Sequence, residues 1–278
     1  MRRMNTANVS GYRAAPRPFG DHLRQWRQHR RLSQLDLAQE AEISTRHLSF
    51  VETGRSLPSR EMVLRLAQRL DVPLRERNAL LVAAGYAPMY RERPLDDPAQ
   101  SAAKQAVELI LKSHEPYPAL AVDRHWNLVA ANSMLPHLLA GADPSLLDPP
   151  VNVLRLSLHP SGLAPSIVNL AQWRNHLFER LRQQIHATGD AVLTALLEEL
   201  RGYPLPEGAG NLQLEGEHLG VAMPLRFRSR FGVLSFISTT TIFGTPLDVT
   251  LQELALETFF PADARTGEVL RDLASRGD

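Results

Sequence analysis

Two short helices joined by a tight turn are encoded by residues 32–60, LSQLDLAQEAEISTRHLSFVETGRSLPSR. Ser33 can cap the first helix, and Asp36 three residues later completes a capping-box arrangement. Ser44 is an N-cap candidate for the second helix, and Gly54 is a suitable residue to end it. Two short helices in this order, with further helices beside them, predict a helix-turn-helix.

Three more helices are predicted around this motif, over residues 19–29, 58–70 and 74–84. In the first of them Phe19, Leu23 and Trp26 recur at helical spacing, which places them on one buried face. The five helices together predict an all-α helix-turn-helix domain over residues 17–90.

The second helix of the motif has the side chains expected of a DNA-reading helix. Small and basic residues lie at its N-terminal end, where a recognition helix meets base edges in the major groove. Gln34 lies in the first turn of the preceding helix, where its amide and free backbone N–H groups can meet a phosphate. Arg55, Ser59 and Arg60 follow the recognition helix and are placed to contact the DNA backbone. These features predict binding to a double-stranded DNA operator.

The order and spacing of these residues resemble the Xre or lambda-repressor type of helix-turn-helix, over about 70 residues. The matching positions are Leu32–Ala38, Ile43-Ser44, Leu48-Ser49, Val51–Arg55 and Pro58-Ser59. Thr53 stands where this family usually has Asn, and its short polar side chain should be tolerated. The resemblance implies a five-helix lambda-repressor-like fold and DNA-facing side chains at Gln34, Thr45, Arg46, His47 and Ser49.

Structural roles compete with DNA contact at several of these positions. His47 can pack against the preceding helix instead of facing DNA, and the two roles have equal weight. Phe50 is expected to pack rather than touch a thymine methyl group, and Glu52 to form an internal ion pair. Arginine makes up 29 of the 31 basic residues, so its frequency alone says nothing about DNA. At Arg46 the motif favours contact with a base or a phosphate.

The net charge of +1 hides an uneven distribution along the chain. Residues 1–93 contain 17 basic and 9 acidic residues, whereas residues 94–278 contain 14 basic and 21 acidic residues. This asymmetry favours a polyanion-binding module joined to an acidic domain of another kind. Residues 1–16 lack periodicity and predict a flexible tail, and the proline-containing stretch 91–100 predicts a linker.

Residues 101–278 predict a second domain of mixed type. A helix at 101–115 precedes a hairpin over residues 119–132, in which apolar runs flank a short polar turn. Helical patterns follow at about 132–140, 166–187 and 190–201, and strands at about 211–215, 219–227 and 231–242. Two early strands, several helices and later antiparallel strands predict an α+β domain. The hairpin resembles the opening of a PAS-type sensor, so we expect a PAS-like domain with an antiparallel sheet.

From Phe19 to its end the chain resembles the MmyB-like branch of bacterial helix-turn-helix regulators. The markers in the second domain are Val122-Asp123 with Asn132, His159-Pro160, Asn169 with Trp173, and residues 243–250. The resemblance implies a PAS-like ligand-binding and dimerisation domain over residues 101–278. It further implies an effector that is small and apolar or fatty-acid-like.

A pocket for such an effector needs aromatic walls and a few polar anchors. The candidate walls are Trp126, Trp173, Phe227, Phe236 and Phe243. Arg174 and Thr239, with Arg226 as a further choice, are candidates to meet a carboxylate. Each aromatic residue has ordinary core packing as its competing role.

Several chemistries are disfavoured by what the sequence lacks. It contains no cysteine, which removes disulfides, thiolate metal sites and cysteine nucleophiles. No two histidines are spaced for a helical metal clamp, and no nucleophile elbow, phosphate loop or dinucleotide fingerprint occurs. We therefore expect no catalytic residue, no metal and no cofactor.

The sequence predicts a cytoplasmic transcription regulator that binds its operator as a homodimer. The first residues lack the apolar core of a signal peptide, and no stretch predicts a membrane span. Two alternatives remain for the second domain: a protein–protein interaction module, or an enzyme or carrier of apolar ligands.

Overall fold

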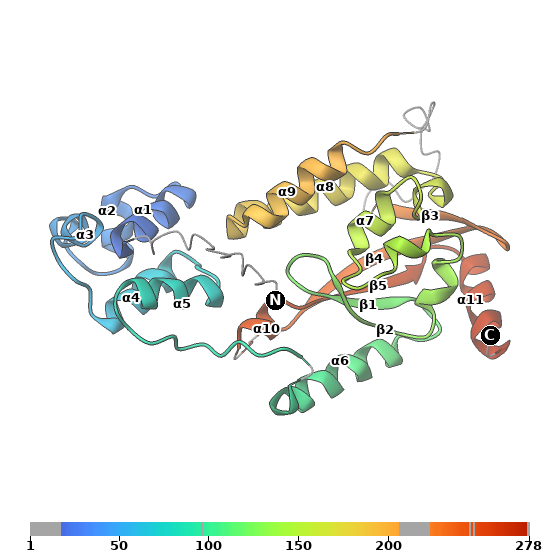
Figure 1. Cartoon of the computed structure of the whole chain (residues 1–278), viewed down its shortest axis with the longest axis horizontal. Helices are drawn as coiled ribbons and strands as arrows, with labels where there is room; N and C mark the ends of the chain where they lie inside the picture. Colours follow the sequence, from blue (N-terminus) through green and yellow to red (C-terminus); the bar gives the residue numbers. More distant parts are fainter. Residues whose placement is uncertain (1–17, 96, 206–222, 245, 247, 277–278) are drawn as a thin grey trace, which may run out of the picture. The chain divides into compact units, whose positions relative to one another are not determined.

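The computed structural model of the chain describes residues 18–95, 97–205, 223–244, 246 and 248–276. These residues form two compact units, divided between Tyr90 and Arg91 (Figure 1). The stretch 91–100, expected to be a linker, therefore belongs to the second unit. The tail expected at 1–16 lies outside the described residues.

The first unit contains five helices, as the sequence predicts. They are α1 (Phe19–His29), α2 (Gln34–Glu40), α3 (Thr45–Glu52), α4 (Arg60–Arg69) and α5 (Leu74–Ala83). Ser33 and Asp36 form the predicted capping box at the start of α2, and Ser44 caps α3. The local capping chemistry thus sets where both helices of the motif begin.

Two backbone details fix how the helices of the first unit meet. Glu42 in the turn between α2 and α3 has a φ of 56°, so this residue takes the left-handed conformation that the tight turn needs. Gly20 lies where α1 crosses α3, and a Cβ atom there would be 2.4 Å from the carbonyl oxygen of Glu52. Only glycine allows this approach, which buries Leu23, Leu48 and their neighbours in one core.

The second unit is built on an antiparallel five-stranded sheet. Its strands are β1 (Ala119–Val122), β2 (Leu128–Ala131), β3 (Pro224–Ser229), β4 (Gly232–Ile242) and β5 (Ala255–Pro261). The spatial order is β2-β1-β5-β4-β3 (Figure 1). The chain makes one hairpin at each edge and then inserts β5 between them, which completes the predicted α+β fold.

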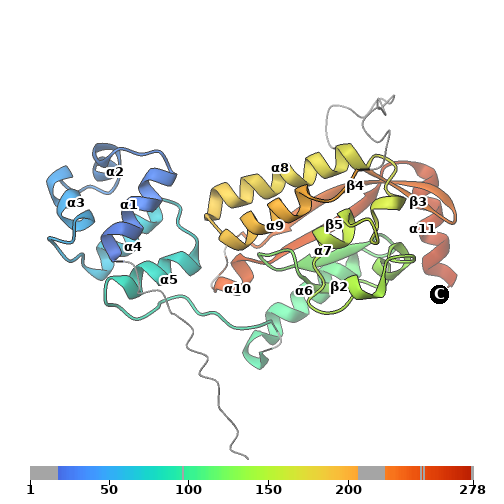
Figure 2. The same ribbon diagram turned by 45° about the horizontal axis from the view of Figure 1, so that its top comes forward.

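Helices lie over both faces of this sheet (Figures 1 and 2). The elements are α6 (Ser101–Ser113), α7 (Val153–Leu158), α8 (Leu170–Thr188), α9 (Ala191–Arg201), α10 (Val249–Gln252), α11 (Ala264–Arg276) and the short 3₁₀ turns Pro98–Gln100, Leu135–Leu138, Pro144–Leu146 and Ala164–Ser166. Successive strand residues point to opposite faces, so Leu120 and Val122 join the larger core under α7–α9. Ala119 and Ala121 instead face α6.

The structure corrects several expected elements of the second unit. The pattern at 132–140 contains only the 3₁₀ turn at Leu135–Leu138. The strand expected at 211–215 lies outside the described residues, and the one expected at 219–227 is observed from Pro224. Strand β5 and helix α11 were not predicted at all, although β5 occupies the centre of the sheet.

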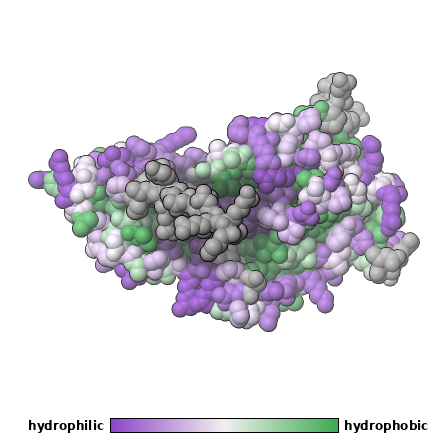
Figure 3. All heavy atoms as spheres, viewed as in Figure 1, coloured by the Kyte–Doolittle hydropathy of each residue, from purple (hydrophilic) through white to green (hydrophobic). Residues whose placement is uncertain are grey.

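On the face that Figure 3 shows, hydrophilic side chains cover most of each unit, and hydrophobic side chains form smaller areas. Within the described residues, no helix combines the length and the hydropathy that crossing a membrane requires.

Candidate functional sites: a helix-turn-helix surface and an apolar cavity

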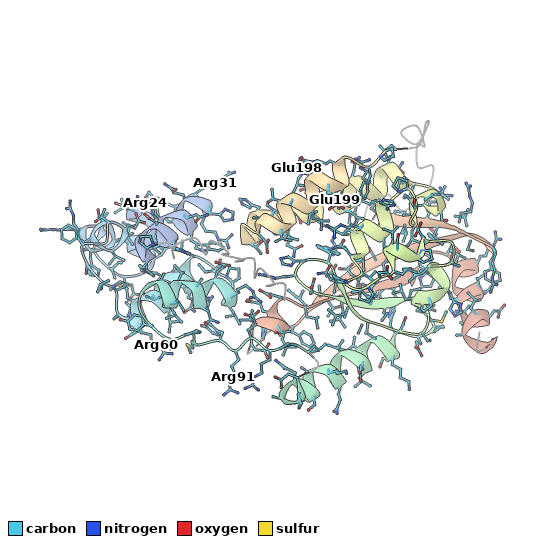
Figure 4. All side chains as sticks on the ribbon, viewed as in Figure 1. Arg24, Arg31, Arg60, Arg91, Glu198 and Glu199 are labelled. Atoms are coloured by element: carbon cyan, nitrogen blue, oxygen red, sulfur yellow. The ribbon has the colours of Figure 1, made fainter. Side chains whose placement is uncertain are left out.

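The predicted DNA-facing residues come from α2, α3 and the start of α4. Leu48 and Val51 anchor α3 in the core, which leaves its other side for solvent. Exposed residues are Arg46, Arg55, Ser59 and Arg60, and half-buried residues are Gln34, Thr45, His47 and Ser49. Figure 4 shows Arg60 on this unit together with Arg24 and Arg31 from α1 and its end. Arg46 in α3 and Arg55 just after it are exposed, as contact with phosphate requires.

A buried carboxylate joins the two helices of the motif, α2 and α3, to α1. Glu52 is buried, and its side chain accepts hydrogen bonds from Arg27 Nε (2.6 Å) and Nη2 (3.0 Å). Gln34 Nε2 donates a third hydrogen bond to it at 2.7 Å. Burial would raise the pKa of Glu52, but the hydrogen bonds from Arg27 and Gln34 and the nearby arginine charges hold the pKa below its usual range. The predicted internal ion pair of Glu52 is thereby confirmed, and the amide of Gln34 is held in place.

Phe50 supports two arginines on the recognition surface. Its half-buried ring lies under the guanidinium groups of Arg46 and Arg55, at 5.3 Å and 5.9 Å from the ring centre. Such cation–π contacts hold long side chains near one position before any DNA arrives. Phe50 thus packs, as expected, and what it packs against is the pair of candidate DNA-contacting arginines.

Two other candidates carry structural roles as well. His47 Nε2 lies 3.3 Å from Met62 Sδ, so its ring contacts α4, whereas the packing role considered from the sequence was against α2. The hydroxyl oxygen of Ser59 accepts a hydrogen bond from Met62 N at 3.2 Å and caps α4. That hydroxyl can still donate its own hydrogen to a phosphate.

An apolar cavity of about 100 Å³ lies in the larger core of the second unit. Its walls come from the β1–β2 hairpin, residues 135–139, α7, α8, β3 and β5; they are formed by Leu120, Trp126, Leu128, Leu135, Leu138, Leu139, Val153, Leu154, Leu156, Ser157, Leu163, Ile167, Trp173, Leu177, Arg180, Leu225, Phe227, Glu257 and Phe259. Three of the predicted wall residues, Trp126, Trp173 and Phe227, are therefore brought together here.

The other five predicted ligand residues do not line the cavity. Arg226 is in β3, where its backbone N–H donates to Asn169 Oδ1 at 2.9 Å. Arg174 donates to the carbonyl oxygens of Tyr203 (2.8 Å) and Arg201 (2.7 Å), so it binds the end of α9. Phe236 is fully buried and meets Phe259 edge to face. Thr239 exchanges a hydrogen bond with Thr258 at 2.7 Å, and Phe243 packs in the smaller core beside α6.

An arginine–glutamate pair is the only charged group in the cavity wall among the described residues. Arg180 Nη2 and Nη1 donate to Glu257 Oε1 (2.6 Å) and Oε2 (3.0 Å), and Thr240 Oγ1 donates to Glu257 Oε1 at 2.9 Å. Glu257 is 4% exposed. Sequence reasoning missed both partners. The available signal was a lone carboxylate within the apolar run 254–260, LALETFF, where a charge must be paired if the strand is buried.

Trp126 occupies a costly backbone conformation in the cavity wall. Its φ is 68°, a region that bulky residues rarely adopt. Its indole N–H donates to Gln184 Oε1 at 2.8 Å, and Arg180 lies over its ring at 4.9 Å from the centre. Strained residues of this kind persist where the surroundings hold them, and they cluster at functional sites.

Comparison with known proteins matches one family model to each unit. The family model described as MmyB-like transcription regulator ligand binding domain matches residues 103–273, and a helix-turn-helix domain model matches residues 18–80. Among solved structures, one titled "Structure of an RNA-binding Light-Oxygen-Voltage Receptor" aligns with 99% of this chain and 70% of its own, at 14% identity and a TM-score of 0.27. A search of curated proteins gave no match.

Proposed function

The chain belongs to the MmyB-like transcription regulators, and we propose that its second unit senses a small apolar or fatty-acid-like molecule that alters operator binding by the first. It is a ligand-responsive, DNA-binding regulator. We further propose that it acts in the cytoplasm as a homodimer on an operator with two related half-sites, about one helical turn apart. We assign no catalytic step to the second unit.

The cavity is the observation that supports an apolar effector. Its wall is apolar except for Ser157, Arg180 and Glu257, and apolar enclosure is what an apolar ligand gains most from. At about 100 Å³ it is comparable with engineered apolar cavities of about 150 Å³ that admit benzene. A longer acyl chain would need the walls to move, which is a way for ligand size to become a conformational signal.

A chain of contacts connects the cavity to the segment that leads to the first unit. β5, which supplies Glu257 and Phe259 to the cavity, directly follows α10. The backbone N–H of Val249 in α10 donates to Arg91 O at 2.9 Å, and Thr250 Oγ1 donates to Arg93 O at 2.6 Å. A shift of β5 on ligand binding would thus reach residues 91–93, and couplings of this kind typically amount to about 1–3 kcal/mol.

The test uses the full chain. Native mass spectrometry of purified protein gives the oligomeric state and any retained ligand, and selection from random DNA gives an operator. Addition of the retained or a supplied apolar ligand should then change operator affinity by about 5- to 150-fold, the range of typical couplings.

A matched pair of variants tests whether the ligand acts on DNA binding through the cavity. Leu177→Phe adds bulk to the cavity wall and should abolish the ligand's influence on DNA binding, whereas Leu109→Phe, on the exposed side of α6, should retain it. An unchanged ligand response in Leu177→Phe would remove the cavity from the proposal. Turnover of the ligand would contradict the absence of a catalytic step.

A further inference from the structure

The polar side of the cavity contains a cation that is already neutralised. Arg180 meets the carboxylate of Glu257 with two parallel hydrogen bonds, the geometry in which guanidinium and carboxylate bind most strongly. Nη2 also donates to Thr240 Oγ1 at 2.6 Å. The pair as a whole carries no net charge, and no other charged side chain of the described residues lines the cavity.

Resting on the proposed sensing role, and narrowing its effector to the apolar, uncharged alternative, we infer that the cavity selects an apolar body with at most one alcohol, ketone or ester oxygen and rejects a carboxylate, including that of a free fatty acid. The Arg180–Glu257 pair sets this specificity. A carboxylate brought to Arg180 would lie beside the buried charge of Glu257, and like charges in a desolvated site repel each other strongly. It could bind only by displacing Glu257, which would leave a buried carboxylate without its partner.

An uncharged oxygen meets no such obstacle. Three of the five guanidinium N–H groups of Arg180 have acceptors on Glu257 and Thr240. The remaining two have no acceptor among the described residues, and the guanidinium lies over the Trp126 ring. One hydroxyl or carbonyl oxygen can accept from this preorganised donor while the rest of the ligand fills the space between leucines and aromatic rings.

The experiment compares two probes of nearly equal size, benzyl alcohol and benzoate, on the full chain at pH 7.5, where benzoate is ionised. Isothermal titration calorimetry should show benzyl alcohol binding at least about 10-fold more tightly than benzoate, which is about 1.4 kcal/mol. The Glu257→Gln variant should reverse the order, because its arginine is no longer neutralised. Glu199→Gln, which removes a carboxylate from a surface pair with Arg155, serves as the matched control and should bind both probes as the unchanged protein does.

Each outcome supports or overturns either the uncharged-ligand inference or the proposed function. Equal binding of the two probes, or tighter binding of benzoate, by the unchanged protein overturns the uncharged-ligand inference and leaves the proposed sensing function standing. This comparison requires no variant, so misfolding of Glu257→Gln cannot obscure it. If neither probe binds and native mass spectrometry finds no retained ligand, the proposed function fails and the inference fails with it. Loss of probe binding in Leu177→Phe would confirm that the probes occupy the cavity.

Discussion

Each unit of the chain contains a buried glutamate paired with a partly exposed arginine, but the two pairs have different surroundings. In the first unit Glu52 is enclosed between α1, α2 and α3, and protein donors from Arg27 and Gln34 surround it. In the second unit Glu257 and Arg180 have protein on one side and the cavity on the other. The same two functional groups therefore hold helices together in one place and define a binding specificity in the other. What decides the role is the space that the pair faces.

This contrast extends to how the units act. The first unit presents its chemistry on its surface, where Phe50 holds Arg46 of the recognition helix and Arg55, which follows that helix. The second unit keeps its chemistry inside, behind α7 and α8. Substitutions that separate stability from binding should accordingly behave differently in the two units.

The largest effect is expected for Glu52→Ala. It leaves the guanidinium of Arg27, which is 11% exposed, without its partner inside the protein. Removing one member of a buried pair typically costs about 3–5 kcal/mol. Hydrogen exchange of amides in α1–α3 of the full chain should report this loss. Glu61→Ala, at a carboxylate whose side chain is 84% exposed in α4, is the control, and an equal loss there would refute the distinction.

A smaller effect, on binding and not on stability, is expected for Arg46→Ala. Its affinity for a selected operator should fall by about 1–3 kcal/mol if the guanidinium reads a base, and by less if it contacts only phosphate. Arg69→Ala, at an exposed arginine near the end of α4, controls for the loss of one positive charge. Equal losses in the two variants would reduce Arg46 to a general electrostatic role. Affinities are to be compared at one salt concentration, because phosphate contacts make binding salt-dependent.

The stability of the two units should also depend differently on pH, with a smaller effect than the two substitutions above. Burial, with the neighbouring Arg180 charge, lowers the pKa of His176 below 6.5, and burial also lowers the pKa of His114. Between the folded and unfolded pKa values the unfolded chain binds more protons, so the second unit is fully stable above about pH 6.5 and loses stability below it. The lowered pKa of Glu52 gives the first unit a contribution that is complete above about pH 4.5 and lost as the pH falls through its folded pKa.

Hydrogen exchange at pH 7.5 and 5.5 would compare the two units in one sample. His176→Gln should flatten part of the pH dependence of the second unit and leave that of the first unaltered. A first unit that weakens as much as the second over this interval would contradict the assignment.

The smallest effect is expected at a third pair that lies on the surface. Arg155 in α7 and Glu199 in α9 also form two hydrogen bonds, both 2.7 Å, but their side chains are 44% and 38% exposed. Exposed pairs contribute about 0–1 kcal/mol, so Glu199→Gln should barely change the free energy of unfolding. A cost near that of Glu52→Ala would show that burial is not what separates these pairs.

The two units differed in how much of them the sequence could predict. The first unit was predicted nearly in full because its signals are local: Ser33 and Ser44 cap helices a few residues away, and Gly54 ends one. In the second unit β5 was missed because Glu257 interrupts an apolar run. The residue that makes this burial possible, Arg180, lies 77 positions earlier in the chain, so no local pattern joins the two.

The residues of the cavity show in the same way that local sequence patterns do not reveal tertiary packing. Aromatic residues at Trp126, Trp173 and Phe227 could be proposed as walls from their type alone. Arg174 and Arg180 lie on the same helix, and only tertiary packing determines that the second faces the cavity while the first binds the end of α9. Phe236 was similarly indistinguishable in sequence from a wall residue, although it serves as core.

The hydrogen-bond partners of the backbone change from the first unit to the second at the peptide bond between residues 90 and 91. The side chain of Asn78 holds the backbone of Met89 and Tyr90 with the first unit, whereas α10 holds Arg91 and the residues that follow with the second. A DNA-reading module that is exchanged at this bond keeps the Asn78 hydrogen bonds that hold its own end. The exchange leaves the hydrogen bonds between α10 and residues 91–93 in place. Recombination between regulators at this bond would therefore yield intact proteins with exchanged operators, whereas a junction near residue 100 would remove the contacts of residues 91–95 with α10 and the smaller core.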